Sequence, residues 1–324
     1  MGKNNHKKNN DNSGFIKALN ERSTNIVHLT HNDLDAVGSD AIHRLKHDKI
    51  FTVWASVGRF ISIFKTIAEC PGNGNMLSIS DLGYQDGAIE AVKIAKENGW
   101  KIEWRDHHRW TDEEKKSIEE NIEYLNINTE VCATGIVFRD LMPDDEWSKE
   151  IARVVCDYDL WHHKEPLSKV LGEVCTKRRN LDIVRDCLLS GSFTNREIDQ
   201  IYKKIYEEKN TAIKKSLSHT KILEGKYKVA FAPLYGYPSE TAHAIRDEMK
   251  TDIEVIVSDN GKFSIRSVPP ISHLIAKKFG GGGHPPAAGG SFKFSFTDKM
   301  AFLILKKNRH YKKLFDVSEK IKAE

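Results

Sequence analysis

The chain has 324 residues, of which 39% are hydrophobic and 30% are charged. This length exceeds what one small core requires and predicts two domains, and the composition is typical of a globular protein. The sequence has no run of about eighteen uncharged apolar residues, which excludes a membrane-spanning helix. The formal net charge of +4 permits an anionic substrate but does not require one.

The N-terminal residues 1–14 are mostly Lys, Asn, His and Asp and lack the apolar core of a signal peptide. We predict that they form a disordered tail and that the protein is cytoplasmic. The sequence has five cysteines, which are Cys70, Cys132, Cys156, Cys175 and Cys187. Their number is odd and no two form a C-x-x-C pair, which favours reduced, mostly buried thiols over a disulfide or a zinc site.

Strand and helix patterns alternate through the first two thirds of the chain. Short apolar runs predict four strands, at residues 25–30, 50–57, 76–80 and 101–104. Apolar residues between these runs keep helical spacing, most clearly at residues 85–98. This alternation predicts an α/β fold with a mostly parallel sheet and helices on both faces, in which ligands bind beyond the carboxyl ends of the strands.

A strongly polar stretch follows, in which the apolar residues again keep helical spacing. We predict a connecting helix at residues 194–221, between a larger domain at 15–193 and a smaller α/β domain at 222–324. In the smaller domain we expect strands at 228–234, 253–258 and 263–268, with helices at 239–250 and 271–279.

Residue types that bind metals gather in four places, each just after a predicted strand or in a loop. They are His31-Asn32-Asp33-Leu34-Asp35, Asp81, Asp106-His107-His108 and Asp157-Tyr158-Asp159. Each has an ordinary explanation, because a strand-end Asp often caps a helix or forms a turn. However, the ends of parallel strands converge on one edge, where so many carboxylates would raise each other's pKa unless divalent cations neutralised them. Carboxylates with a few imidazoles suit manganese or magnesium better than zinc or copper.

The order of these clusters is distinctive. An H-x-D-x-D motif beginning at His31 is followed by a strand-end Asp, a literal D-H-H triplet, and D-x-x-x-W ending at Trp161. Near the C-terminus, residues 281–289 read GGGHPPAAG, shortly after a predicted strand that contains Arg266-Ser267. Together these motifs resemble the DHH superfamily of phosphoesterases and its C-terminal DHH-associated domain, over roughly residues 25–296.

The resemblance implies that six side chains hold two divalent cations, with manganese ranked before magnesium. The first cation would be bound by His31 and Asp33, the second by Asp35, His107 and Asp157, and Asp81 would bridge the two. Two of these assignments have competitors. His28 competes with His31 but lies inside the predicted strand, and Asp159 competes with Asp157, which the aromatic residue four positions later favours.

The resemblance also implies roles for residues beyond the metal ligands. His108 would face the scissile phosphate, and Asp106 would orient a histidine. Four consecutive glycines exceed what a helix cap requires and let backbone N–H groups approach an anion. The DHH-associated domain would therefore bind substrate phosphate through Arg266, Ser267, Gly282, Gly283 and His284.

Such a site predicts a metal-dependent phosphodiesterase in which activated water attacks phosphorus. The motifs most resemble enzymes that hydrolyse short oligonucleotides to mononucleotides, an oligoribonuclease-like exonuclease activity. A RecJ-like single-strand DNA exonuclease ranks second, and a cyclic dinucleotide phosphodiesterase or 3′,5′-bisphosphate nucleotide phosphatase third. The expected partners are short single-stranded RNA or DNA, or small nucleotides, without membrane contact; a homodimer is left open. An inactive nucleotide binder is disfavoured because every expected ligand position is filled.

Overall fold

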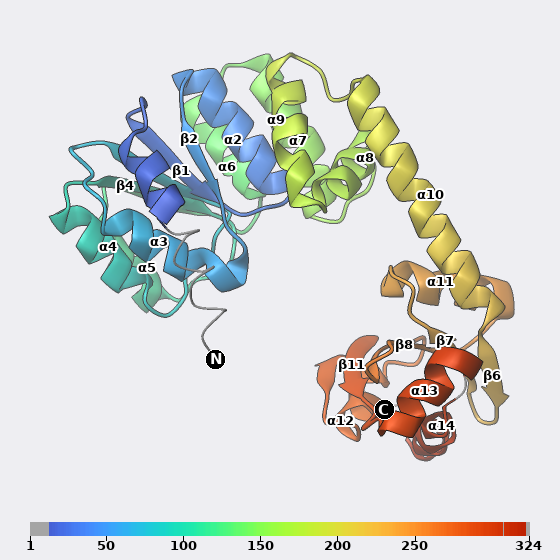
Figure 1. Cartoon of the computed structure of the whole chain (residues 1–324). Coiled ribbons are helices and arrows are strands. Elements are labelled where there is room, and N and C mark those ends of the chain that lie inside the picture. The colour runs from blue at the N-terminus through green and yellow to red at the C-terminus, as the bar shows by residue number, and fades with distance from the viewer. Residues whose placement is uncertain (1–12, 307, 322–324) are drawn as a thin grey trace. The chain divides into compact units, whose positions relative to one another are not determined.

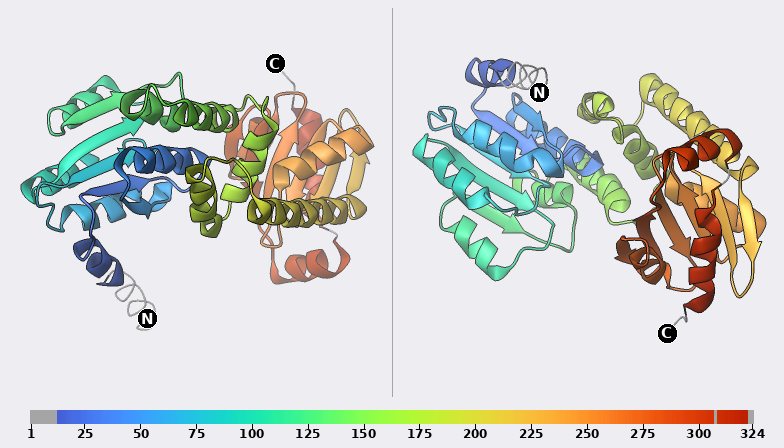
Figure 2. Two further views of the ribbon diagram at one scale, coloured as in Figure 1. Left: turned by 90° about the horizontal axis from the view of Figure 1, so that it is seen from above. Right: turned by 60° about the horizontal axis from the view of Figure 1, so that its bottom comes forward.

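The computed structural model describes residues 13–306 and 308–321, and the chain divides into two compact units between Tyr202 and Lys203. Most of the predicted tail lies outside the described residues. Its last two residues, 13 and 14, are helical together with residues 15–20, in the short blue helix at the periphery of the first unit in Figure 2. Leu19 of this helix is fully buried in the core of the first unit.

The first unit is built on a five-stranded parallel sheet in the order β2-β1-β3-β4-β5 (Figure 1). Its strands are β1 (Ile26–Thr30), β2 (Phe51–Trp54), β3 (Met76–Ser80), β4 (Lys101–Asp106) and β5 (Tyr124–Ile127). The predicted parallel sheet is confirmed. The strand predicted at 50–57 ends early, at Trp54. Strand β5 was not predicted because Tyr124 is exposed, the other three residues are only partly buried, and the strand shows little apolar patterning.

Helices cover both faces of this sheet. They are α2 (Leu34–His47), α3 (Phe60–Ala68), α4 (Ala88–Glu97), α5 (Asp112–Glu119), α6 (Ala133–Leu141), α7 (Glu146–Asp159), α8 (Pro166–Cys175) and α9 (Leu181–Leu189), with short 3₁₀ turns at Val57–Arg59 and Arg178–Asn180. Helices α3, α4 and α5 lie on one face and α2 and α6 on the other, with α7, α8 and α9 packed against α2. Trp104 of β4 meets the edges of Phe60 and Phe64 of α3, which fixes that layer.

The second unit is built on a mixed sheet in the order β10-β11-β9-β8-β7-β6. The units divide within α10 (Arg196–Ser218), near the predicted connecting helix. The strands are β6 (Lys221–Glu224), β7 (Lys228–Pro233), β8 (Ile253–Val257), β9 (Lys262–Ser267), β10 (Gly282–His284) and β11 (Ala287–Ser291). The helices are α11 (Pro238–Met249), α12 (Ser272–Lys277), α13 (Phe296–Leu305) and α14 (His310–Lys320).

Helices also cover the second sheet. The apolar residues of α14, red in Figure 2, join the core on one face through Tyr311 and Leu314. Ala242 and Ile245 of α11 pack with strand residues in a separate cluster. Among the described residues of the whole chain, no helix has both the length and the apolar character needed to cross a membrane.

Two of the cysteines are joined. Cys132 and Cys156 form a disulfide, whereas the other three are free and buried. The prediction that all five thiols are reduced is therefore wrong for this pair. The two residues are 24 positions apart in the sequence, and their Cα atoms come within 5.2 Å because α6 packs against α7. That contact between helices is tertiary, so cysteine spacing alone could not indicate it.

Candidate active site

The predicted metal-binding clusters meet at the carboxyl edge of the parallel sheet. His31 follows β1, Asp81 follows β3 and His107 follows β4, and the parallel register brings the ends of these strands together. Potential ligand atoms form three groups, each within 4.8 Å: His31, Asp33 and Asp81; Asp81, His107 and His108; and Asp35, His107 and Asp159. Because Asp81 and His107 each belong to two groups, the three groups form one continuous site.

Asp33 and His31 form the outer part of this site. His31 Nδ1 lies 2.7 Å from Asp33 Oδ2 and 3.6 Å from Asp81 Oδ2. The other oxygen of Asp33 caps α2 by accepting the N–H of Ala36 at 3.1 Å. The ordinary explanation of Asp33 as a helix cap therefore holds for one oxygen and leaves the other directed at His31.

Asp81 lies at the centre of the site. It is 3% exposed, and its Oδ2 is buried without a hydrogen-bond partner. Its backbone has a φ of 56°, a left-handed conformation that Asp tolerates better than most residues. A buried carboxylate oxygen without a partner is costly, and a bound cation would remove that cost. The residue therefore fits a ligand shared between two cations.

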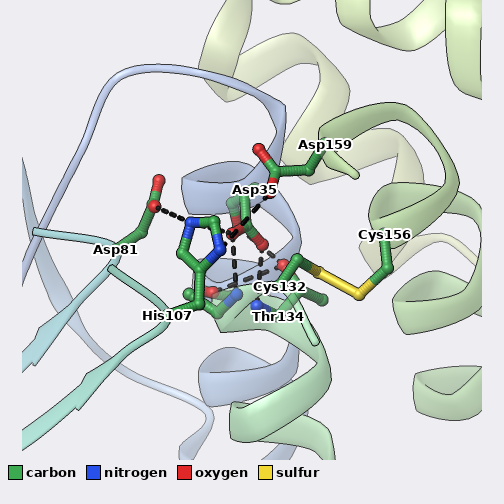
Figure 3. Close-up of a disulfide and its surroundings, with 9 residues drawn as sticks. Asp35, Asp81, His107, Cys132, Thr134, Cys156 and Asp159 are labelled. Carbon is green, nitrogen blue, oxygen red and sulfur yellow. Dashed lines mark hydrogen bonds and ion pairs between the residues drawn. A yellow bond between two sulfur atoms is a disulfide. The ribbon is translucent and has the colours of Figure 1, made fainter. Parts of the chain in front are cut away.

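The imidazole of His107 is surrounded by three carboxylates (Figure 3). Its Nε2 lies 3.3 Å from Asp81 Oδ1 and 3.7 Å from Asp35 Oδ2, and its Nδ1 lies 3.6 Å from Asp159 Oδ2. Asp35 is almost fully buried, and its carboxylate accepts the N–H groups of Ala133 and Thr134, each at 2.7 Å. These two N–H groups begin α6, whose N-terminal end favours a negative charge.

Asp157 does not join the site, which corrects the sequence-based ligand set. Its carboxylate accepts the N–H groups of Lys164 and Glu165 at 2.9 and 3.0 Å and the hydroxyl of Ser168 at 2.6 Å. Burial alone would raise the pKa of Asp157, but these hydrogen bonds outweigh it and lower the pKa. Asp157 thus fixes the turn into α8. Asp159 lies two positions later, about 200° further around the helix, and faces His107 instead.

His28 does not join the site either. It is fully buried, with Nδ1 2.7 Å from Asp40 Oδ1 and Nε2 2.8 Å from Ser80 Oγ. Both ring nitrogens are therefore already hydrogen-bonded within the protein interior. Of these two histidines, His31, which follows β1, is therefore the one that can bind a cation.

His108 and Asp106 form a pair beside the ligand groups. Asp106 is fully buried and lies 2.8 Å from His108 Nδ1, and it also accepts the indole N–H of Trp110 at 2.8 Å. The hydrogen bond to Asp106 raises the pKa of His108, although burial opposes the shift. The ring of His108 is half-exposed and lines a cavity of about 480 Å³ together with His31, Asp81 and Asp159.

Without a cation, the site holds extra protons. Burial and the charge of Asp159 raise the pKa of Asp35 to about 7, and burial and the charge of Asp33 raise the pKa of Asp81 well above its usual value. Burial lowers the pKa of His31, but the hydrogen bond to Asp33 and the nearby negative charges of Asp33 and Asp81 outweigh it and raise that pKa to about 10. The protons on these groups compete with any cation that binds here.

We therefore expect manganese to bind more weakly as the pH falls from about 8 to about 6. Asp35 takes up a proton as the pH falls through about 7, and His31 is protonated throughout this range. A bound cation must displace these protons, and each displaced proton costs roughly a factor of ten per pH unit. Calorimetric titration with Mn²⁺ in buffers of different ionisation enthalpy measures both the Kd and the protons released. An unchanged Kd with no proton release would contradict this expectation.

In the second unit, Arg266 and His284 lie in register across the sheet. Arg266 of β9 and His284 of β10 both pair with Ala287 of β11, which lies between them. Residues paired across neighbouring strands project from the same face of a sheet. Arg266 donates a hydrogen bond to Ser239 Oγ at 2.9 Å, and His284 is exposed. The two candidate phosphate-binding side chains therefore lie on one face of this unit.

Two predicted phosphate-binding features differ from expectation. Ser267 is 3% exposed and its hydroxyl lies 2.7 Å from Ser272 Oγ, so it is not available to a phosphate and we remove it from the set. The glycine run is not a free loop, because Gly282 and Gly283 belong to β10. A Cβ on the preceding Gly281 would lie 1.9 Å from Gly289 O, so that glycine is required for strand packing. Gly282 is exposed and has no such neighbour.

Comparison with known proteins supports the fold. No protein-family model and no curated protein matches the sequence. The pGpG-specific phosphodiesterase PggH from Vibrio cholerae matches with a TM-score of 0.56 and 11% identity, over 87% of this chain and 98% of that one. A manganese-bound RecJ exonuclease matches with a TM-score of 0.54 and 12% identity, over 97% and 94%.

A third match is the DHH domain of a member of a family of ribosomal proteins, with a TM-score of 0.53 and 15% identity. It covers 97% of this chain and 90% of the other. At such low identities these similarities concern the fold, and they extend over nearly the whole chain. The fold that the motifs predict is confirmed.

Proposed function

We propose that this protein, whose fold is that of the DHH superfamily, is a cation-dependent phosphodiesterase that hydrolyses short oligonucleotides to mononucleotides. The observation that carries the proposal is the continuous set of carboxylate and imidazole atoms at the sheet edge. A buried carboxylate oxygen of Asp81 lacks a partner within this set. Perturbed titratable groups that converge beside a cavity are characteristic of catalytic sites.

The donor atoms fit two hard divalent cations. His31 and Asp33 would hold the first, Asp35, His107 and Asp159 would hold the second, and Asp81 would contribute to both. Carboxylate oxygens with a minority of imidazoles suit Mn²⁺, with Mg²⁺ as the alternative. When bound, the cations supply Lewis acidity, which activates a water for attack on phosphorus and offsets the negative charge of the phosphate.

His108 is the proposed proton donor. The hydrogen bond from its ring to buried Asp106 fixes the orientation of the ring and raises the pKa of His108, which favours its protonated form. A protonated imidazole at the cavity can stabilise a phosphate oxygen or protonate the leaving oxygen. Asp106 acts through His108 as a positioning residue.

The cavity beside the ligand groups supports a small substrate. Its volume of about 480 Å³ lies within the range of small-molecule sites. Tyr84, Gln85 and Arg109 line it next to the histidines and carboxylates, offering a ring, an amide and a positive charge to a nucleotide. The Vibrio cholerae neighbour is, by its name, specific for the dinucleotide pGpG. These observations favour short oligonucleotides over long strands.

The second unit is proposed to bind substrate phosphate through Arg266 and His284, with the backbone of Gly282 and Gly283. We expect Arg266→Ala and His284→Ala each to lower kcat/KM roughly tenfold to a hundredfold, because a hydrogen bond to a charged group contributes about 1.5–3 kcal/mol. Lys262→Ala, an exposed position at the other end of β9, is the matched control. Kinetics and manganese content should be measured together. Loss of manganese with unchanged substrate binding would contradict this role.

The similarity to RecJ favours a single-strand exonuclease as the second candidate. Substrate length separates the two functions. We expect RNA of about two to five nucleotides to be degraded faster than strands of about twenty or more, since longer strands need a track of stacking aromatics and basic residues. Assays at low and moderate salt are needed, because phosphate contacts favour long strands at low salt. Processive cleavage of long single-stranded DNA with dinucleotides left intact would support the RecJ-like function.

A further inference from the structure

The disulfide joins a helix that holds one proposed metal ligand to a helix that bears another (Figure 3). Cys132 is the N-cap residue of α6, and the next two residues, Ala133 and Thr134, donate the N–H groups that hold the Asp35 carboxylate. Cys156 lies in α7, three positions before Asp159. The bond therefore joins the helix end that anchors one proposed ligand to the helix that bears another.

We propose that the Cys132–Cys156 disulfide is a redox-sensitive brace of the cation site, which holds Asp35 and Asp159 around His107 and loosens the site when it is reduced. The inference rests on the proposed function, because it concerns the same ligands. It adds a modification site, the cystine itself, and a class of reagent that acts on it, a dithiol reductant.

The geometry shows why a brace matters at this position. Asp35 and Asp159 approach His107 from its two ring nitrogens at 3.7 and 3.6 Å, which is longer than a hydrogen bond. These contacts do not fix the two carboxylates by themselves, and two carboxylates repel each other in the absence of a cation. Their separation therefore depends on the backbones of α6 and α7.

The cross-link lies where these two helices are in close contact. A Cβ on Gly135 of α6 would lie only 3.1 Å from Cys156 Sγ. Thr134 Oγ1 also donates to the backbone oxygen of Asp35 at 2.6 Å, so a shift of the start of α6 would move Asp35 with it. No such contact is seen between Asp159 and α6 among the described residues, and the disulfide supplies that connection.

The reduction is chemically straightforward. Cys132 is fully buried and Cys156 is partly exposed, so a thiolate of the reductant attacks the sulfur of Cys156. The Cys132 sulfur leaves with the bonding electron pair and takes up a proton. The second thiol of the reductant then displaces Cys156 as a thiol. The reductant ends as a cyclic disulfide, two electrons have passed to the protein, and a disulfide oxidant such as oxidised glutathione reverses the change.

The test is the affinity for Mn²⁺ alone, measured by calorimetry on the full chain. Wild type is compared as purified under oxidising conditions, after reduction with a phosphine that is then removed, and after reoxidation with oxidised glutathione. We expect reduction to weaken Mn²⁺ binding about tenfold to a hundredfold, the usual effect of losing support around metal ligands, and reoxidation to restore it. The Cys132→Ser/Cys156→Ser variant retains the three free cysteines and should bind weakly in all three treatments.

The outcomes separate this inference from the proposed function. A Kd that stays within about twofold in reduced wild type would overturn the brace and leave the cation site intact. Five free thiols in oxidised protein, counted by mass spectrometry, would also overturn it. Absence of Mn²⁺ binding in oxidised wild type would instead refute the proposed function. Circular dichroism of reduced wild type shows whether the weaker binding arises in a folded protein, and unfolding on reduction would contradict a local brace.

Discussion

Asp81→Asn is expected to lower phosphodiesterase turnover by roughly a thousandfold and to leave the fold intact. Cations at such sites contribute several kcal/mol to the transition state, and about 4 kcal/mol corresponds to a thousandfold in rate. Asp81 belongs to two of the three ligand groups, so the amide weakens both cation positions together. Initial rates and metal content by mass spectrometry give the measurement.

The same substitution should spare the metal-free protein. The pKa of Asp81 is raised well above its usual value by burial and by Asp33 and Asp35, which favours the neutral acid over the carboxylate when no cation is bound. An amide has the shape of that neutral acid, and thermal melts in chelator should show no loss of stability. Asp86→Asn, at an exposed position on the loop after β3, is the control. Near wild-type turnover of the Asp81 variant with full metal content would contradict its assignment.

Asp159→Asn is expected to lower activity and Asp157→Asn to lower stability. Asp159→Asn should lower kcat/KM by about a hundredfold or more by weakening the second cation, with little change in stability, because Asp159 is partly exposed beside His107. Asp157→Asn should lower the free energy of unfolding by about 1–3 kcal/mol, because its buried carboxylate accepts three hydrogen bonds at the turn into α8.

Each of these variants is the control for the other. Urea unfolding gives the stability and steady-state kinetics give kcat/KM under conditions where both proteins are folded. If Asp157→Asn loses manganese and activity while Asp159→Asn keeps both, the ligand assigned from the sequence pattern is the right one and the placement of Asp159 here is wrong.

The strand-end positions could be predicted from the sequence because they depend on local patterns. An apolar run ends where a strand ends, and β3 has the predicted bounds, Met76–Ser80. Parallel pairing then carries Asp81 and His107 to the same edge without further information. The convergence of these strand-end residues therefore followed from the strand pattern, whereas their roles as ligands came from the resemblance to the DHH superfamily.

The choice between Asp157 and Asp159 could not be made in the same way. The two residues differ by two positions in one helix, so which of them faces His107 depends on how α7 is rotated against α2 and α6. The motif spacing favoured Asp157 but carries no information on that rotation. Hydrogen bonds from Lys164 and Glu165, which follow the helix, show that the Asp157 carboxylate is already used.

Two other differences have the same origin in tertiary packing. Ser267 was placed among the phosphate ligands because it follows Arg266, but alternation along β9 points it into the core, where it meets Ser272. The disulfide joins cysteines on different helices whose contact no local pattern records. In both cases the sequence shows which residue is present but not which residue its side chain meets in the folded protein.

The central claim, that this site is a cation-dependent phosphodiesterase centre, is tested most directly by adding Mn²⁺ stepwise to chelator-treated protein. Hydrolysis of a 5′-phosphorylated dinucleotide is followed by chromatography at each step. We predict no hydrolysis before Mn²⁺ is added and a rate that rises until about two equivalents are bound, with Ca²⁺ restoring less because it prefers all-oxygen shells. Full-rate hydrolysis in excess chelator would contradict the claim.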